Sequence, residues 1–408
     1  MTFTSLKTQQ PRCLTVGKAL DTIQLPVKGQ GVLLFDASGP CCLTYCDVSG
    51  TPGFTVRFTE TSVQVNLQPS NEPLVDHKNT KGIVKQRGAY YWFSLDAQNQ
   101  RLYAGIGEAR TETAIYTYQW SWTHERKLFL ESLASVTLEG LQVRSILRDP
   151  ITRSVPLYVK GTDELTMDMV ASSRYLPKAN LSIIAQKLYD CISGKQFCLN
   201  GPDFPEFSQA IEHSIRTPGK WCYERLKQKA TEFDKDKPNE KETYLRITLG
   251  ENNGESPGIP YVMEIWPVGH YSPIHNHGGS SAVIRVLHGS IHVSLFPFLS
   301  GDQLEPFGTA DFKKDDFTWI SPGLNQVHQL KNLDGNKDTC ITIQCYMYPQ
   351  DDSKHYDYFD YLDGNEKKQQ YEPDSDMDFL EFKALMKKEW EETCALASRS
   401  SSWFSCKR

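Results

Sequence analysis

The stretch "PVGHYSPIHNHGGSSAVIRVLHG", residues 267 to 289, carries two histidines that are separated by one residue and lie between two glycines. Its composition is typical of strands, and residues i and i+2 of a strand point to the same face of a sheet. His275 and His277 are therefore expected to project together, and Asn276 to project away from them. Two neutral imidazoles that converge on one point favour a metal site over a packed core.

A third histidine lies in the separate stretch "WISPGLNQVHQLKN", residues 319 to 332. His328 follows a proline-glycine turn there, and Asn332 comes four residues after it. We therefore predict that His275, His277 and His328 are three ligands of one metal ion, contributed by two hairpins.

These two stretches resemble the two signature motifs of the cupin barrel. The first motif is a glycine, five residues, His-x-His, three or four residues, a glutamate, six residues and a glycine. Gly269, His275, His277 and Gly289 match it without a gap. The resemblance implies a jelly-roll-like β-barrel that holds a metal.

The second cupin motif has a proline-glycine turn, a histidine, and an asparagine four residues after that histidine. His328 and Asn332 match it, although Asn325 stands where the motif has its second glycine. The resemblance therefore covers both segments that carry the predicted ligands.

The chain departs from the first motif at the glutamate, where Ala282 stands. The metal would then have three histidine ligands and no protein anion. Among cupins this pattern resembles the thiol dioxygenases, and cysteine dioxygenase most closely, which implies one Fe(2+) per chain. The segment "YLRITL" resembles that family's Tyr-x-Arg segment and places Arg246 at the position of its substrate-carboxylate arginine.

The segment "TIQCYMYP" resembles the late strand of the same family, which carries a Ser-x-His-x-Tyr array. That array is Thr342, Gln344 and Tyr346 here, and all three share one face of a strand. The resemblance implies a catalytic role for Tyr346. Gln344 replaces the usual histidine, so a hydrogen-bond relay to Tyr346 would be neutral. Ala282 excludes the Cys-Tyr thioether of the animal enzymes.

The resemblance implies oxidation of L-cysteine by O2 to cysteine sulfinic acid. A cysteine thiolate would supply the missing anion, with the amine as a second metal ligand and the carboxylate paired with Arg246. Imidazole ligands alone do not name the metal. Two alternatives stay open: another small thiol (3-mercaptopropionate, cysteamine or an N-terminal cysteine) as substrate, or a non-catalytic metal-binding cupin.

Residues 20 to 145 are predicted to form a β-sandwich. "FTVRFTETSVQVNLQ" alternates with a period of two, and short alternating strands with polar turns are typical of sandwiches. "YYWFSLDAQNQRLYAGIGEARTETAIYTYQW" resembles the β-domain named after farnesoic acid O-methyltransferase. Methyl transfer is not supported, because the Gly105-x-Gly107 pair lacks a third glycine and a following helix. We expect a binding or oligomerisation module with a carbohydrate or protein ligand.

The remaining pattern predicts a connector over residues 146 to 178, then helices. In "NLSIIAQKLYDCIS", Ile184, Leu188 and Ile192 share a helical face, with Asn180 or Ser182 as the cap. "FSQAIEHSIRT", "WCYERLKQKATEF" and "DFLEFKALMKKEWEE" are further helix candidates. The fold class is therefore mainly β, with a sandwich at 1–150, a cupin domain at 165–365 and a helical tail at 366–408.

Bulk properties narrow the class of function. The net charge of −6 gives no electrostatic case for nucleic acid or an anionic membrane surface. "MTFTSLKTQQPRC" has no apolar segment of a signal peptide, and no apolar run is long enough to span a membrane. The 11 cysteines show no zinc-finger spacing. We therefore expect a cytoplasmic protein with reduced thiols and a small-molecule substrate.

Overall fold

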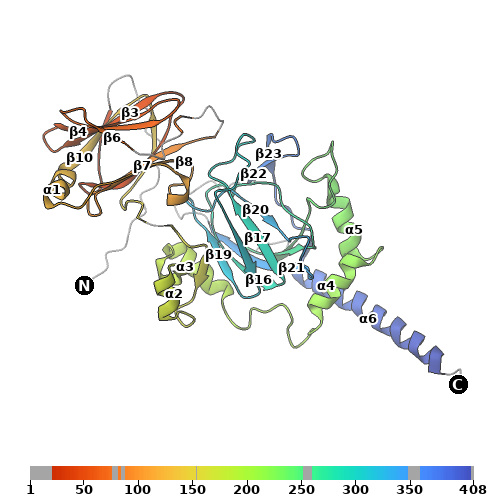
Figure 1. The fold of residues 1–408 in the computed structure, drawn as a ribbon. Helices are drawn as coiled ribbons and strands as arrows, with labels where there is room; N and C mark the ends of the chain where they lie inside the picture. The colour runs from red at the N-terminus through yellow and green to blue at the C-terminus, as the bar shows by residue number, and fades with distance from the viewer. Residues whose placement is uncertain are drawn as a thin grey trace. The chain divides into compact units, whose positions relative to one another are not determined.

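A computed structural model describes residues 21–75, 81–83, 88–152, 154–250, 260–347 and 359–405, with side chains as far as residue 396. The chain divides into two compact units, Met1–Val155 and Pro156–Arg408 (Figure 1). Residues 1–20, the segment in which no signal peptide was predicted, lie outside the described residues. No helix in the described ranges combines the length and the apolar character needed to cross a membrane.

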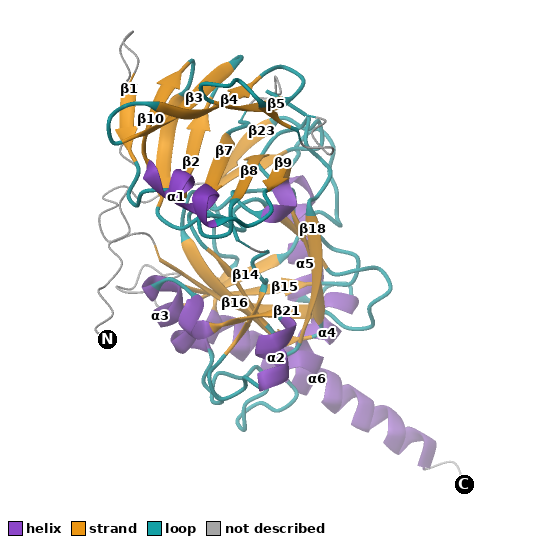
Figure 2. Ribbon diagram, turned by 60° about the vertical axis from the view of Figure 1, so that its left-hand side comes forward, coloured by secondary structure: helices purple, strands orange, loops and turns teal. Residues whose placement is uncertain are grey.

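The first unit consists of two antiparallel sheets (Figure 2). The six-stranded sheet has the order β1 (Asp21–Gln24), β10 (Leu133–Glu139), β3 (Cys41–Asp47), β4 (Pro52–Phe58), β5 (Val63–Leu67) and β6 (Pro73–Leu74). The five-stranded sheet has the order β11 (Gln142–Leu147), β2 (Gln30–Asp36), β7 (Tyr91–Asp96), β8 (Arg101–Ile106) and β9 (Ala114–Gln119). A 3₁₀ turn η1 (Thr111–Thr113) and helix α1 (His124–Ser132) complete the unit.

Aromatic side chains from both sheets fill the space between them. The ring of Phe35 on β2 lies 5.2 Å from that of Phe58 on β4, and Tyr45 on β3 lies 5.4 Å from Phe93 on β7. All four rings are buried, as the period-two pattern requires. The predicted sandwich is confirmed, but α1 is a departure, because the region was predicted to contain strands alone.

The second unit is also mainly β. Its eight-stranded sheet has the order β13 (Tyr175–Pro177), β12 (Tyr158–Lys160), β19 (Phe317–Ile320), β16 (Ser281–His288), β21 (Cys340–Met347), β15 (Tyr261–Trp266), β14 (Leu245–Leu249) and β24 (Met377–Asp378). A three-stranded sheet has the order β18 (Gly308–Lys313), β17 (Ser290–Leu295) and β20 (His328–Lys331). Strands β22 (Phe359–Leu362) and β23 (Lys368–Tyr371) form a hairpin.

The eight-stranded and three-stranded sheets face each other across a shared interior. Val286 of β16 packs in one buried cluster with Val293 of β17 and Phe312 of β18. Between the sheets lies a cavity with a mainly apolar lining, here called the apolar cavity. The mainly β prediction is confirmed, and the described strands make two facing sheets rather than one closed barrel.

Helices occupy the segments on either side of these sheets. They are α2 (Met167–Ser172), η2 (Lys178–Asn180), α3 (Ile183–Ile192), α4 (Phe207–Arg216), α5 (Trp221–Gln228), η3 (Lys229–Thr231) and α6 (Phe379–Ser405). Ser182 caps α3 by accepting a hydrogen bond from Ala185 N at 3.2 Å. The predicted connector at 146–178 is wrong in part, because β11 ends and β12, α2 and β13 form within it.

Two glycines of the segment 267–289 have backbone conformations that are unfavourable for residues with a side chain. Gly269 has φ +84° and Gly289 has φ +68°, both in the left-handed region. A Cβ added at Gly289 would lie 2.6 Å from the carbonyl oxygen of Thr339. Asn325 also has a positive φ of 62°, a conformation that asparagine tolerates, which explains how it replaces a glycine in this turn.

We predict that Gly289→Ala destabilises the second unit by at least about 1–2 kcal/mol, the cost of a left-handed alanine, with the backbone clash in addition. Thermal unfolding followed by circular dichroism measures the effect. Gly308→Ala is the matched control, because a Cβ there meets no atom within 4 Å. Equal unfolding temperatures for the two variants would contradict the argument.

Candidate metal centre

The three histidines come from two segments whose backbones are paired. His275 N donates to His328 O at 3.1 Å, and His328 N donates to His275 O at 3.0 Å. The predicted strand at His275 and His277 is wrong: both lie between β15 and β16, and β16 begins only at Ser281. Pro273 and the positive φ of Gly278 interrupt the ladder, so the segment makes single bridges instead.

The imidazoles nevertheless converge. The ring centroids are 4.9 Å apart for His275 and His277, 4.7 Å for His275 and His328, and 4.8 Å for His277 and His328. One nitrogen from each ring lies within 4.8 Å of the other two. The Nε2 atoms of His277 and His328 are 3.2 Å apart. The structure thus brings together three residues that the spacing alone predicted as one set.

Backbone carbonyls orient two of the rings. Nδ1 of His275 lies 3.0 Å from Pro273 O, and Nδ1 of His328 lies 3.0 Å from Asn325 O. A carbonyl only accepts, so each Nδ1 carries the proton and each Nε2 presents a lone pair. Nδ1 of His277 is buried without a hydrogen-bond partner among the described residues. This arrangement of outer hydrogen bonds is typical of metal-binding histidines.

Burial keeps the three rings neutral. It lowers the pKa of His275 to about 4. The pKa of His328 falls to about 3 for the same reason, with His275 contributing. Burial also holds the pKa of His277 well below its usual range, assisted by His328, His275 and Arg246. Neutral imidazole is the form that binds a metal, so protons do not compete for this site near neutral pH.

The donor set fits a divalent transition metal. Two nitrogens bound to one ion at about 2.0–2.2 Å lie about 2.8–3.6 Å apart for angles between octahedral and tetrahedral. The observed 3.2 Å between His277 and His328 Nε2 falls in this range. No carboxylate of the described residues joins the group. Three imidazoles suit iron, zinc, copper or nickel, so the ligands support a metal and leave its identity open.

A second cavity, here called the polar cavity, opens beside His275 and His277. His275 and His277 line it together with the polar side chains of Arg246, Glu264 and Tyr346. Its other walls are mainly aromatic and comprise Phe233, Tyr244, Phe359, Tyr361 and Tyr371. Two of the three predicted ligands therefore meet the predicted arginine and tyrosine at one cavity.

Arg246 lies on β14 and is tied to the segment that precedes α6. Its backbone N donates to Asp376 Oδ2 at 2.7 Å, and its Nη1 donates to Pro373 O. Its partner in the sheet register is Glu264 of β15. The guanidinium keeps further N–H donors, because one carbonyl occupies only one of five.

Tyr346 lies over one of the three predicted metal ligands, His277. Its ring stacks on His277 at 5.7 Å between centroids with 19° between the planes, and its hydroxyl donates to Gln344 Oε1 at 2.5 Å. Ala282 pairs with Tyr346 across β16 and β21 and packs against it in a buried cluster. Cys345 points to the opposite face of β21, with Sγ 3.3 Å from Leu188 O. The arrangement gives Tyr346 a methyl neighbour at Ala282 and directs the adjacent thiol elsewhere.

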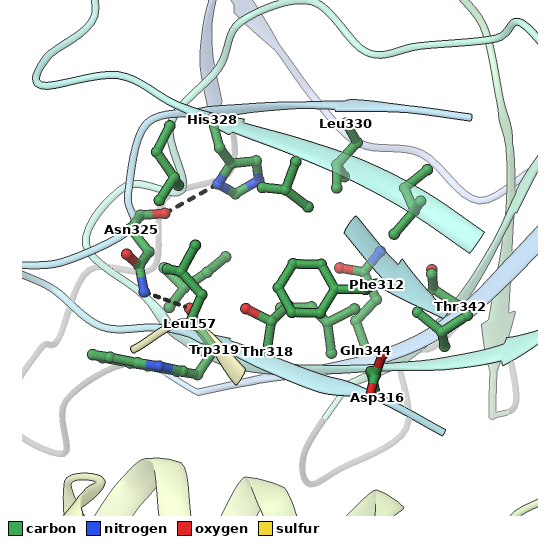
Figure 3. A pocket seen from close by; sticks show the side chains of 16 residues that line it. Leu157, Phe312, Asp316, Thr318, Trp319, Asn325, His328, Leu330, Thr342 and Gln344 are labelled. Atoms are coloured by element: carbon green, nitrogen blue, oxygen red, sulfur yellow. Dashed lines mark hydrogen bonds between the residues drawn. The ribbon is translucent and has the colours of Figure 1, made fainter. Parts of the chain in front are cut away.

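Gln344 and Thr342 line the apolar cavity, which His328 also reaches (Figure 3). Figure 3 shows the hydrogen bond from His328 to Asn325, and the one from Asn325 Nδ2 to Trp319 O at 3.0 Å. Through its bond to Tyr346, Gln344 links the apolar cavity to the polar cavity. Thr342 Oγ1 is buried and has no partner among the described residues.

Sequence reasoning missed Glu264. Its side chain is 6% exposed, and burial raises its pKa to about 7 although Arg246 opposes the shift. The signal was present, since Glu264 is the single charged residue of the apolar strand "YVMEIW". Phe359 was also missed; its ring lies 4.8 Å from that of His277.

Comparison with known proteins gives similarities of low extent. No family model matches the chain. The cupin domain of Schizosaccharomyces pombe Cnp3 matches at 17% identity and a TM-score of 0.21, over 26% of this chain and 65% of that one. The DMSP lyase DddQ from Ruegeria pomeroyi matches at 16% and 0.20, over 27% and 49%. A Cupin_2 domain of a transcriptional regulator from Enterobacter cloacae matches at 13% and 0.20, over 26% and 98%.

The chain thus spans less than two thirds of the first two proteins, and two of the three are described as cupin domains. TM-scores near 0.2 assign neither an activity nor a ligand to this chain. The chemistry of the site has to be argued from its own residues.

We predict that His277→Ala or His328→Ala removes most bound metal, because two imidazoles hold a divalent ion far more weakly than three. Inductively coupled plasma mass spectrometry after anaerobic loading with iron(II) measures the stoichiometry. His292→Ala is the control. His292 of β17 pairs with Asp311 of β18, so this variant should keep one metal per chain. Full occupancy in both ligand variants would refute the three-histidine site.

We also predict that metal binding changes little between pH 8 and pH 5 and is lost only as the pH approaches about 4. The depressed pKa values of His275 and His328 keep both rings neutral in that range, whereas free imidazole protonates near 6.5. Equilibrium dialysis against iron(II) or zinc over this range is the measurement. A loss of metal with a midpoint near pH 6.5 would contradict the prediction.

Proposed function

We propose that the second unit is a cupin-type, iron(II)-dependent thiol dioxygenase that oxidises L-cysteine with O2 to cysteine sulfinic acid. One observation carries the proposal: two members of a three-histidine group that includes no carboxylate, His275 and His277, line one cavity with Arg246 and Tyr346. The arrangement combines a neutral ligand set with an anion-binding side chain and a hydroxyl. Cysteine offers a complementary group to each of these.

The charge of the site favours a thiolate substrate. Three neutral imidazoles leave the 2+ charge of a bound ion uncompensated by protein, since no carboxylate of the described residues joins the group. Iron(II) bound there would supply a site for sulfur and the redox chemistry with O2. The reaction balances without another reductant, because one thiol and one O2 give one sulfinic acid that retains both oxygen atoms.

Arg246 is proposed to bind the substrate's carboxylate. Its guanidinium lines the polar cavity beside His275 and His277, and it retains donors beyond the one used by Pro373 O. A planar guanidinium binds a carboxylate through two parallel hydrogen bonds, which also fixes orientation. The thiol of a small amino acid held in this way is directed toward the histidines.

Tyr346 is proposed to position the sulfur and the oxygen that adds to it. Its hydroxyl donates to Gln344 Oε1, and a hydroxyl oxygen can also accept a hydrogen bond. Gln344 is an amide and does not take up the proton, which makes Tyr346 an orienting residue rather than one end of a proton relay. The aromatic walls at Phe359 and Tyr361 exclude water from the same space.

We predict oxygen consumption by the iron-loaded protein with L-cysteine, at a higher kcat/KM than with cysteamine or 3-mercaptopropionate. Arg246→Ala should lower kcat/KM for L-cysteine by at least about tenfold, the effect of losing one charge-assisted hydrogen bond. Cysteamine, which has no carboxylate, should change little. An oxygen electrode and mass spectrometry of the sulfinic acid formed under labelled O2 are the measurements.

The same experiment separates the alternatives. Iron binding without oxygen uptake from any thiol would indicate a non-catalytic metal-binding cupin, in line with the neutral Gln344–Tyr346 pair. A wild-type preference for cysteamine or for a peptide with an N-terminal cysteine would remove the carboxylate role from Arg246. His292→Ala again serves as the control, because its side chain pairs with Asp311 away from the two cavities.

A further inference from the structure

Two opposite charges lie side by side on one wall of the polar cavity. Arg246 of β14 and Glu264 of β15 are register partners, so their side chains share one face of the sheet. Both line the polar cavity with His275 and His277. No direct ion pair joins the two, and Oε2 of Glu264 is buried without a hydrogen-bond partner among the described residues.

A buried carboxylate oxygen without a partner is costly, because it has lost water and gained no hydrogen bond. Glu264 is 6% exposed, and the residues before and after it in the sequence of β15 are apolar. Burial raises its pKa to about 7, while Arg246, a hydrogen bond with the Gln344 side chain and, less strongly, Lys229 and Trp266 favour the charged form. A cationic group that entered the cavity would meet an acceptor with an unused lone pair.

A ligand with both charges would satisfy both side chains. A zwitterionic α-amino acid offers a carboxylate to Arg246 and an ammonium group to Glu264. Cysteamine offers only the ammonium group, and 3-mercaptopropionate offers only the carboxylate, which Glu264 repels. The sequence alone gave the amino group of cysteine one partner, the metal; the structure adds a carboxylate.

We propose that Glu264 is a specificity-determining residue that, together with Arg246, selects thiols whose head group is a zwitterionic α-amino acid. This inference rests on the proposed function, because the thiol end must reach the histidines that line the same cavity. Arg246 and Glu264 then bind the carboxylate and the ammonium group of the thiol, and the histidine site acts on the sulfur.

The test is anaerobic binding of three thiols to the iron-loaded full chain, measured by isothermal titration calorimetry. Glu264→Gln keeps the shape of the side chain and removes its charge. It should weaken L-cysteine by at least about tenfold, the loss of one charge-assisted hydrogen bond, and leave 3-mercaptopropionate equal or tighter. The preference for L-cysteine over 3-mercaptopropionate should therefore fall by at least about tenfold.

Two further variants sharpen the comparison. Glu242→Gln is the matched control: burial raises the pKa of the half-buried Glu242 to about 7 as well, but Glu242 does not line the polar cavity, so the preference should be unchanged. Glu264→Asp keeps the charge and should keep the preference for L-cysteine. A ratio of affinities is compared because partial misfolding would reduce the bound fraction for all thiols alike.

Equal weakening of L-cysteine and 3-mercaptopropionate by Glu264→Gln would overturn the inference and make Glu264 a support of the cavity wall. A loss of the preference in Glu264→Asp would overturn it as well. Failure of the proposed function looks different: wild-type protein would then bind none of the three thiols, or consume no oxygen with any of them.

Discussion

The reciprocal backbone hydrogen bonds between His275 and His328 are the constraint on which the site depends. They join two segments that are distant in the sequence, and they hold the imidazole rings of His275 and His328 close to each other. The carbonyls of Pro273 and Asn325 then hold two of the rings by their Nδ1 atoms. The Nε2 atoms of His275 and His328 are thereby oriented by backbone rather than by a mobile side chain.

Charge balance follows from this frame. Burial lowers the pKa of all three imidazoles, so they are neutral ligands and a bound cation would need an anion from elsewhere. Arg246 adds a positive charge and Glu264 adds a group that titrates near neutrality. The combined charge of a bound metal ion, Arg246 and Glu264 favours a ligand that carries negative charge. The thiolate and carboxylate of cysteine, the proposed substrate, supply it. The described side chains that take part all belong to the second unit.

Aromatic side chains fill the interior of the first unit. Trp92 and Tyr116 are fully buried, and the Tyr116 hydroxyl donates to Leu74 O at 3.0 Å. Residues of this kind stabilise a sandwich core and are not available as a ligand platform. A ligand of the sandwich, if one binds there, has to use its exposed loops or strand edges, and the predicted carbohydrate or protein partner stays a prediction.

The sequence by itself determined what depends on short-range order. Period-two alternation predicted β4, β5, β7 and β8, apolar residues at helical spacing predicted α3, and His-x-His with a later histidine predicted the metal set. The three histidines come together although the premise of that prediction fails, since His275 and His277 lie outside any strand and His275 is joined to β20 by a single bridge with His328. Only the tertiary structure decided the position of Glu264 opposite Arg246 and of Phe359 against His277. Strand register and the return of a distant hairpin depend on pairing energies summed over the whole sheet, and no local pattern of residues encodes them.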